Sequence, residues 1–518
     1  MGDGRGTSSD WRRPCGAVGG MSDFILVLDA GTGSGRAVAV PLQRGGVAYV
    51  ALEEWNYVFP DPSDDSLVEF DAEKFWGALV SAARLALRSV EGHVVAVAAT
   101  SQREGIVLLD ESGGEVYAGP NFDMRAPRAQ EWCTGEAARG IYRITGHWPV
   151  PMFAPYRLLW LRERRPELFA SIRSMLTIND WIAYRLTGEC VVEASNGSDT
   201  LLQDITRRDW AQEIVGGLGL PRDILPRTVS SGTQIGTIRD GVALELGLPA
   251  GTPVYAGGAD TQAALLSLGG YEAGVCGLVA GTWNPIQLVV DRPLIDPDER
   301  LWTSCHLIPG EWVLESTAGV GGAAYRWVRD VMYGHSVPYE AVTAEASSIA
   351  PTGIRLRAHL GACVMSAKSL HPTRWAGLVG GNPVIGAVTY SRGNVARAVL
   401  EGMAFAIRGN CEQLTSVSGM QLAELRACGG STQNVLLLSI IANVLGLPVR
   451  VPQHTEGSAV GVAMSTAVSL GVFANYEAAS RELVAWRDPI EPDACQVEAY
   501  SEAYYRWLME QALLDSGL

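Results

Sequence analysis

A short glycine-rich stretch near the start of the chain combines residue types that bind phosphate. Residues 29 to 36 read DAGTGSGR: Asp29 ends an apolar run, and three glycines alternate with Thr32 and Ser34. Glycines leave backbone N–H groups accessible, and successive N–H groups form concavities that bind anions. The hydroxyls add donors, and a carboxylate can hold a hydrated Mg²⁺ between polyphosphate oxygens. The stretch therefore predicts a turn that holds the phosphates of ATP with their metal ion.

Two better known phosphate-binding patterns do not fit this stretch. No lysine follows, as it would in G-x-x-x-x-G-K-[ST], and a predicted strand comes next, whereas the dinucleotide fingerprint opens a helix. A phosphate turn without that lysine is typical of actin-like ATPases. An ordinary glycine-rich hairpin is the alternative.

Polar residues also follow two other predicted strands. Gln102, Arg103 and Glu104 come after the apolar strand at 93–101, where they offer donors and acceptors to a polyol. Asp260 follows a glycine run after a strand and precedes a helix, where a carboxylate faces a cleft and can accept a proton. The alternatives are a simple turn at 102–104 and a helix N-cap at Asp260.

Alternating strands and helices must position these residues, which is an α/β pattern. Ligands in such folds bind where strands end, and the polar residues gather there. The predicted elements of the first half are strands at 24–31, 35–42, 47–55 and 93–101, a helix at 71–90, and a hairpin at 104–117 that turns at Gly113-Gly114.

The second half repeats the opening motif. Residues 276–290 again give strand, Gly281-Thr282 tip and strand, which suggests two related halves with a boundary near residue 270. A chance echo is the alternative. A helix follows at 392–414, and 425–452 gives strand, Gly-Gly-Ser turn, helix and strand.

Composition excludes several classes of protein. The chain has 518 residues, which favours at least two domains, and its formal charge of −16 argues against nucleic-acid and anionic-membrane partners. Nine scattered cysteines without a C-x-x-C pair favour a reducing cytoplasm. No apolar run reaches the roughly 18 residues that span a bilayer. Residues 1–20 are predicted to be a disordered, glycine-rich tail or to precede the true start at Met21. A homodimer is left open.

Five segments in order resemble the FGGY carbohydrate kinases of the actin and hexokinase superfamily. They are DAGTGSGRAV (29–38), SQREGIVLLD (101–110), GGADTQAAL (257–265), AGTWN (280–284) and CGGSTQN (428–434). The resemblance spans about 26 to 465. It implies two actin-like (ribonuclease H-like) ATPase domains, 21–270 and 271–518, with a catalytic cleft between them. It also implies ATP and Mg²⁺ as cofactors and a sugar or polyol as substrate.

The resemblance also implies a role for each site residue. Asp260 is the general base, and Asp29 and Asp260 hold the metal. The substrate side comprises Gln102, Arg103, Glu104, Asp123, Asp260 and Gln262. ATP and its phosphates are held by Gly31, Thr32, Gly33, Ser34, Arg36, Gly281, Thr282, Gly322, Arg326, Gly430, Ser431 and Asn434. Arg326 could equally be a solvated helix residue.

The substrate is less defined than the reaction. Asn121, Met152 and Thr261 stand where glycerol kinases carry aromatic residues and a second glutamine, and Arg157 replaces the family's lysine. Longer stretches resemble the autoinducer-2 kinases, which phosphorylate open-chain 4,5-dihydroxy-2,3-pentanedione. The alternatives are a pentulose or polyol kinase acting on xylulose, ribulose, erythritol or glycerol, and a non-enzymatic actin-like sugar-binding regulator.

Overall fold

The computed structural model describes residues 22–44, 46, 48–126, 133–352, 356–368, 376–381 and 390–516. The predicted tail at 1–20 lies outside these ranges. Within them no helix is both long and apolar enough to cross a membrane, and the cysteines they contain are free thiols.

The first half is built on a six-stranded mixed sheet with the order β12-β13-β4-β1-β2-β3. β4 and β13 run in the same direction as β1, and the other neighbours are antiparallel. The bounds are β1 Ser22–Ala30, β2 Ser34–Pro41, β3 Tyr49–Glu54, β4 Gly92–Ser101, β12 Gln234–Thr237 and β13 Pro253–Ala259.

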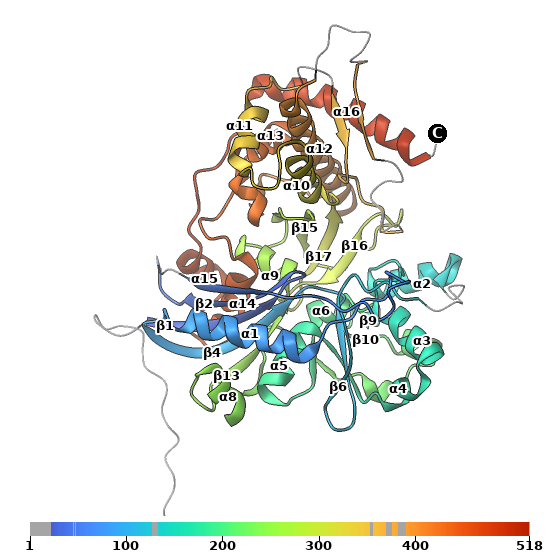
Figure 1. Ribbon diagram of the computed structural model, residues 1–518, viewed down its shortest axis with the longest axis vertical. Coiled ribbons are helices and arrows are strands. Elements are labelled where there is room, and N and C mark those ends of the chain that lie inside the picture. The colour runs from blue at the N-terminus through green and yellow to red at the C-terminus, as the bar shows by residue number, and fades with distance from the viewer. Residues whose placement is uncertain are drawn as a thin grey trace, which may run out of the picture.

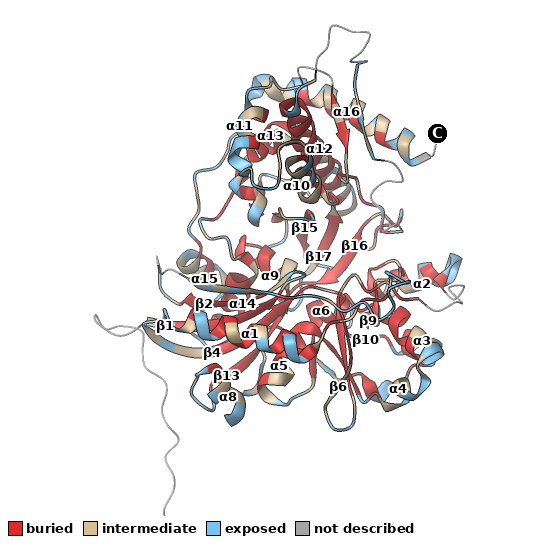
Figure 2. Ribbon diagram, viewed as in Figure 1, coloured by how far each residue is buried: buried red, intermediate tan, exposed pale blue. Residues whose placement is uncertain are grey.

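The central strand of this sheet is buried on both faces. Leu26 and Leu28 pack in the core beneath α1 (Ala72–Leu87). Ile25 and Val27 point to the opposite face and pack with α14 (Gly457–Ser469). Burial on both faces explains why β1 has a continuous apolar run instead of alternating polar and apolar residues. Figure 2 shows the central strands of this sheet largely in red, the colour of buried residues.

The second half repeats the arrangement around the order β16-β17-β15-β14-β20-β21. β14 pairs antiparallel with β15 and parallel with β20, as β1 pairs with β2 and β4. The predicted relation between the halves is thus present in their topology. The strands are β14 Cys276–Val279, β15 Pro285–Val290, β16 Trp302–Cys305, β17 Trp312–Thr317, β20 Leu425–Cys428 and β21 Val449–Arg450; the covering helices are α10 Gly321–Met332, α11 Tyr339–Ser347, α12 Arg392–Ser418, α13 Val435–Leu445 and α16 Ala494–Ser516.

The chain does not divide cleanly in space at one residue. After β21 it returns to the first sheet, where α14 and α15 (Tyr476–Leu483) cover one face (Figure 1). Gly461 of α14 lies so close to α9 (Asp260–Ser267) that a Cβ there would stand 1.8 Å from the Ala263 carbonyl oxygen. The linear boundary near residue 270 stays a prediction.

Shorter elements fill the rim of the first half. The hairpin predicted at 104–117 is present as β5 and β6, and β7 pairs with β5. Their bounds, with those of the remaining elements, are β5 Ile106–Leu109, β6 Glu115–Gly119, α2 Gly135–Thr145, α3 Ala154–Arg164, α4 Pro166–Ser171, β7 Ser174–Thr177, α5 Ile178–Thr187, β8 Val191–Glu193, α6 Ala194–Ser198, β9 Gln203–Asp204, β10 Asp209–Trp210, α7 Gln212–Gly217, η2 Arg222–Ile224, β11 Arg227–Val229, α8 Asp240–Leu246, β18 Arg357–His359, β19 Gly377–Val379 and η3 Gly430–Gln433.

Candidate active site

Three parallel strands bring the predicted catalytic residues to one edge of the first sheet. Asp29 at the end of β1 lies opposite Thr100 of β4, and Ala259 of β13 lies opposite Ser101. Gln102–Glu104 and Asp260 follow those strand ends directly. Carboxyl ends of parallel strands are where α/β sheets bind ligands.

The tip of the β1–β2 hairpin is exposed, and hydrogen bonds from neighbouring side chains hold its backbone. Gly31 N–H donates to the Ser34 carbonyl at 3.0 Å, while Thr32 and Gly33 face solvent. The Trp55 indole and the Tyr57 hydroxyl both donate to the Thr32 carbonyl. The backbone of the turn is therefore fixed before any ligand binds, as a preorganised anion site requires.

Arg36 links this turn to the second half of the chain. Its guanidinium lies 3.5 Å from the Asp29 carboxylate and 3.1 Å from Glu456, the residue before α14. Burial raises the pKa of Asp29, the Arg36 charge opposes that rise, and Glu456 adds to it. Glu456 was missed in the sequence because nothing marks a residue 420 positions away as a neighbour of Arg36.

Asp260 is the first residue of α9 and is only partly exposed. Ala259 occupies the N-cap position, so the alternative interpretation of Asp260 as an N-cap is not supported. Burial raises the pKa of Asp260 to about 7; Arg103 and Arg36 lower it, and Asp29 raises it further. A carboxylate with this proton affinity suits a general base at neutral pH.

A buried network holds the strand end that presents Asp260. Ser195 Oγ accepts a hydrogen bond from Ala259 N–H at 3.0 Å. Glu193 Oε2 accepts from the Ser195 amide at 2.9 Å and from its hydroxyl at 2.5 Å. Both residues are fully buried. They were missed in the sequence, where the polar run ASNGSD is the one available signal.

Arg103 lies at the centre of an acidic cluster. Its two Nη atoms donate to the two Glu315 carboxylate oxygens, both at 2.7 Å. Asp199 lies 3.6 Å and Glu104 3.8 Å from the guanidinium. Glu315 belongs to β17, so the pair joins the two halves. Glu315 and Asp199 were both missed in the sequence.

The residues beside Arg103 shape the same region. Gln102 accepts from Asn121 N–H at 3.1 Å and donates to the Gly31 carbonyl at 3.2 Å, which ties it to the phosphate turn. Glu104 has a positive φ of 59°, and its buried Oε1 lies 3.8 Å from Arg103 Nε but has no hydrogen-bond partner. Burial raises the pKa of Glu104 to about 8, which Arg103 opposes.

Asp123 lies deeper than its predicted role suggests. It is fully buried, and its carboxylate accepts from Val68 N–H at 3.2 Å, from Arg125 at 2.7 Å and from the Tyr117 hydroxyl. These partners occupy both of its oxygens. Its part in substrate binding stays a prediction, and the contacts seen here are structural.

Arg157 donates hydrogen bonds to four backbone carbonyls, and its Nε also lies 3.8 Å from the Asp123 carboxylate. Its guanidinium donates to Glu104 at 2.6 Å, Pro120 at 2.8 Å, Met152 at 2.7 Å and Asp123 at 3.2 Å. It therefore joins three loops on the substrate side. The fork of donors in arginine suits this role better than the single ammonium of lysine.

Gln262 lies on α9, two residues after Asp260. It is fully buried, accepts from the Thr261 hydroxyl at 2.7 Å and approaches Asp199 at 3.4 Å. The structure thus places it beside the acidic cluster, and its contact with substrate stays a prediction.

The second predicted phosphate turn, at Gly281-Thr282, is packed against α10. A Cβ on Gly322 would stand 1.9 Å from the Gly281 carbonyl oxygen, so only glycine allows this approach. Arg326 Nη2 reaches Thr282 Oγ1 at 3.5 Å. The structure therefore brings these four residues together. Arg326 itself is exposed, so its nucleotide role and the solvated alternative both stay predictions.

The predicted adenosine-side residues lie next to that turn. Ser431 N–H donates to the Ala280 carbonyl at 2.9 Å, and Gly430 precedes it. Asn434 instead caps α13, where its side chain accepts from Leu437 N–H and donates to Thr343 at 3.2 Å. Its nucleotide contact stays a prediction.

Asp29 and Asp260 fit the predicted magnesium only as a pair. The described residues contain no cluster of three or more His, Cys, Asp or Glu side chains that could hold an ion. Mg²⁺ in phosphoryl transfer is commonly bound by one or two carboxylates together with substrate phosphates. Two carboxylates at one sheet edge are consistent with that mode.

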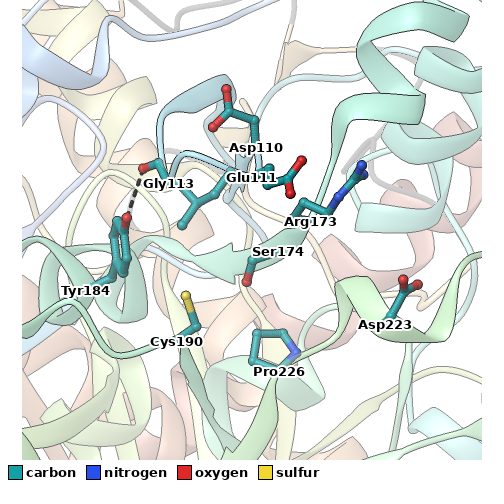
Figure 3. Close-up of a pocket in the computed structure, with 10 residues that line it drawn as sticks. Asp110, Glu111, Gly113, Arg173, Ser174, Tyr184, Cys190, Asp223 and Pro226 are labelled. Carbon is teal, nitrogen blue, oxygen red and sulfur yellow. Dashed lines mark hydrogen bonds between the residues drawn. The ribbon is translucent and has the colours of Figure 1, made fainter.

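A cavity among the described residues lies away from these strand ends. It measures about 430 Å³, and Ser174, Tyr184 and Cys190 point into it beside the β5–β6 turn (Figure 3). None of the predicted site residues lines it. Its size therefore does not identify the active site, which is defined here by converging strand ends.

Comparisons with known proteins agree with this geometry. A model of the FGGY family of carbohydrate kinases, N-terminal domain, matches residues 24–267, and one of its C-terminal domain matches 276–470. An autoinducer-2 kinase of Klebsiella pneumoniae is 32% identical over 518 residues, with 96% of each chain covered. Structures of a gluconate kinase and a xylulose kinase of Lactobacillus acidophilus each give a TM-score of 0.86 at 19% identity, covering 96% of this chain and 99% of theirs. The predicted fold class is confirmed.

Proposed function

The chain belongs to the FGGY family of carbohydrate kinases and is an ATP-dependent carbohydrate kinase; on that premise we propose that its acceptor is autoinducer-2 in the form of 4,5-dihydroxy-2,3-pentanedione. The similarity to an autoinducer-2 kinase, 32% over 96% of both chains, carries this proposal. Family membership sets aside the alternative of a non-enzymatic regulator.

Asp260 is the base of the proposed reaction. It accepts the proton of the acceptor hydroxyl as the oxygen of that hydroxyl bonds to the γ-phosphorus. The bond from phosphorus to the β–γ bridging oxygen breaks, and ADP leaves. The transition state of phosphoryl transfer needs little covalent help, so alignment and a correctly placed carboxylate supply most of what the protein must provide.

The two glycine turns receive the phosphates in this proposal. The N–H groups of Gly31 and Gly281 close the turns by donating to the Ser34 and Trp283 carbonyls. The backbone N–H groups that follow them, of Thr32–Ser34 and of Thr282, donate to phosphate oxygens from opposite halves. Mg²⁺ bound through Asp29 and Asp260 would neutralise charge on the transferring group. The adenosine then lies toward Gly430 and Arg326.

The acceptor occupies the region between Asp260 and Arg103. Glu104 offers a buried oxygen without a hydrogen-bond partner there, and Gln102 connects the region to the first phosphate turn. Closure of the halves over both substrates would exclude water and limit ATP hydrolysis.

The test is ADP release with Mg-ATP across a panel of acceptors, with Asp260→Asn as the blank. The panel contains dihydroxypentanedione, xylulose, ribulose, erythritol and glycerol. We expect dihydroxypentanedione to give a kcat/KM at least about tenfold above the others, a difference equivalent to about 1.4 kcal/mol of transition-state binding.

Preference for a pentulose or polyol would contradict the proposed acceptor and leave the kinase assignment intact. Such a result would mean that the similarity reflects ancestry, since a few pocket residues decide specificity.

A further inference from the structure

The carboxylate of Glu315 occupies the position that a negatively charged substrate would need. It pairs with both Nη atoms of Arg103 at 2.7 Å, in the side-by-side geometry that arginine uses to bind carboxylates. The side chains are 10% exposed for Arg103 and 2% exposed for Glu315. The pair is therefore formed away from bulk water.

The second half of the chain supports this carboxylate. Gln287 of β15 donates to Glu315 Oε2 at 2.6 Å, and its Nε2 also lies 3.2 Å from Thr261 Oγ1. Glu315 is thus fixed from its own sheet as well as from Arg103.

The other basic side chains near the cluster already have acidic partners. His147 Nε2 lies 3.0 Å from Asp199, and Arg36 lies between Asp29 and Glu456. In the described part of the chain, the cluster around Arg103 thus offers no unpaired cation to an incoming anion.

We infer that Glu315 makes the acceptor site selective for uncharged polyhydroxy substrates and excludes sugar acids. A substrate carboxylate could reach Arg103 only by displacing Glu315, which would leave a buried carboxylate without its counter-ion. This inference rests on the proposed function, because it assumes that acceptors bind beside Arg103.

Two further features fit an uncharged acceptor. Glu104 Oε1 and Gln287 Oε1 are buried oxygens without a hydrogen-bond partner, and both can accept from substrate hydroxyls. Burial raises the pKa of Glu104 to about 8, and the charges of Asp199, Glu315 and Asp260 add to that rise.

The test uses a matched pair of inhibitors, xylitol and xylonate, against the best neutral acceptor of the panel. They share a carbon chain and differ at one end, where xylonate carries a carboxylate. We expect the Ki of xylonate to be about 100-fold higher in the wild type, as like charges in an interface cost several kcal/mol. In Glu315→Gln, the Ki of xylonate should fall at least about tenfold, while the Ki of xylitol stays within about threefold of the wild-type value.

Two control variants separate charge from structure. Glu311→Gln removes a carboxylate from the same hairpin outside the cluster. It should leave the ratio of the xylonate Ki to the xylitol Ki unchanged. Glu315→Asp keeps the charge and should retain the exclusion. If Glu315→Gln does not fold, the wild-type ratio and Glu315→Asp still decide the matter.

Equal inhibition of the wild type by both compounds would overturn the inference. An equal loss of affinity for xylitol and xylonate in Glu315→Gln would also overturn it. If the wild type turns over neutral acceptors and xylonate alike, this inference alone fails. If it turns over no acceptor, the proposed function fails first.

Discussion

Asp260 owes its expected reactivity to its surroundings more than to its residue type. An ordinary exposed aspartate is almost fully ionised at neutral pH and a weak base. Burial at the end of β13 moves the pKa of Asp260 to about 7, against the opposing charges of Arg103 and Arg36. The base is thus tuned by the sheet edge on which it lies.

This tuning predicts a pH dependence. Asp260 must be deprotonated to act, and its pKa in the folded enzyme is raised, so activity should fall as the pH drops below about 7. We expect kcat/KM for the acceptor to decrease toward tenfold per pH unit in that range, because this constant reports the free enzyme. Initial rates over about pH 5.5 to 8.5 check this, and a flat profile would contradict it.

At the scale of single elements, the site depends on residues that hold strand ends and loops. The Glu193–Ser195 network fixes the amide before Asp260, and Arg157 fixes the loops around Glu104. Neither group needs to touch substrate. Both act by positioning residues that do.

Ser195→Ala should lower kcat by about tenfold with a small change in KM for ATP. The substitution leaves the buried Ala259 N–H without an acceptor, which costs about 1–3 kcal/mol and lets the strand end shift. A positioning role also predicts a changed pH profile, because the surroundings of Asp260 change. Loss of thermal stability with unchanged kcat and pH profile would show that the role is only structural.

Arg157→Lys should destabilise the fold and raise the acceptor KM. Lysine cannot satisfy the same carbonyls, and unpaired buried carbonyls cost about 1–3 kcal/mol each. We expect the free energy of unfolding to fall by about 2–4 kcal/mol in urea denaturation.

Arg162→Lys is the matched control, since Arg162 lies on the same helix and contacts carbonyls at the surface. An equal loss for both variants would contradict the role given to Arg157.

At the scale of the molecule, the halves are interlocked. α14 comes from the end of the chain and covers the first sheet, and the pairs Arg36–Glu456 and Arg103–Glu315 join the halves at the site. Part of the hydrophobic core of the first half is therefore formed by residues far away in sequence.

A fragment of residues 21–270 should not form a stable domain. Without α14, the face with Ile25 and Val27 would be exposed, and each such side chain contributes about 1.5–3 kcal/mol when buried. We expect strong binding of a hydrophobic dye and no cooperative thermal transition by circular dichroism. Fusing residues 455–486 to the fragment should abolish the dye binding and restore a cooperative transition. Cooperative unfolding of the fragment alone would contradict this account.

The sequence predicted local features well and distant partners poorly. The hairpins whose tips lie beside Asp29 and at Gly281 were predictable, because apolar strands and glycine-rich tips are local signals. Asp260 was predictable because strand, glycines and helix follow one another. Glu315, Asp199 and Glu456 were not, because each meets its arginine through the packing of elements about 100 to 420 residues apart. Asp123 was predicted to lie on the substrate side, but it is buried and its carboxylate is bound by neighbouring groups of the fold.

The most direct test of the central claim is mass spectrometry of the acceptor after incubation with Mg-ATP, for the wild type and for Asp260→Asn. We predict a phosphorylated dihydroxypentanedione with the wild type. The variant should form it about 10²–10⁴-fold more slowly, because it loses the proton acceptor and one of the two proposed magnesium ligands. It should still bind ATP, because the two glycine turns are unchanged. Turnover by the variant within tenfold of the wild type would contradict the role of Asp260 and the account of the site built around it.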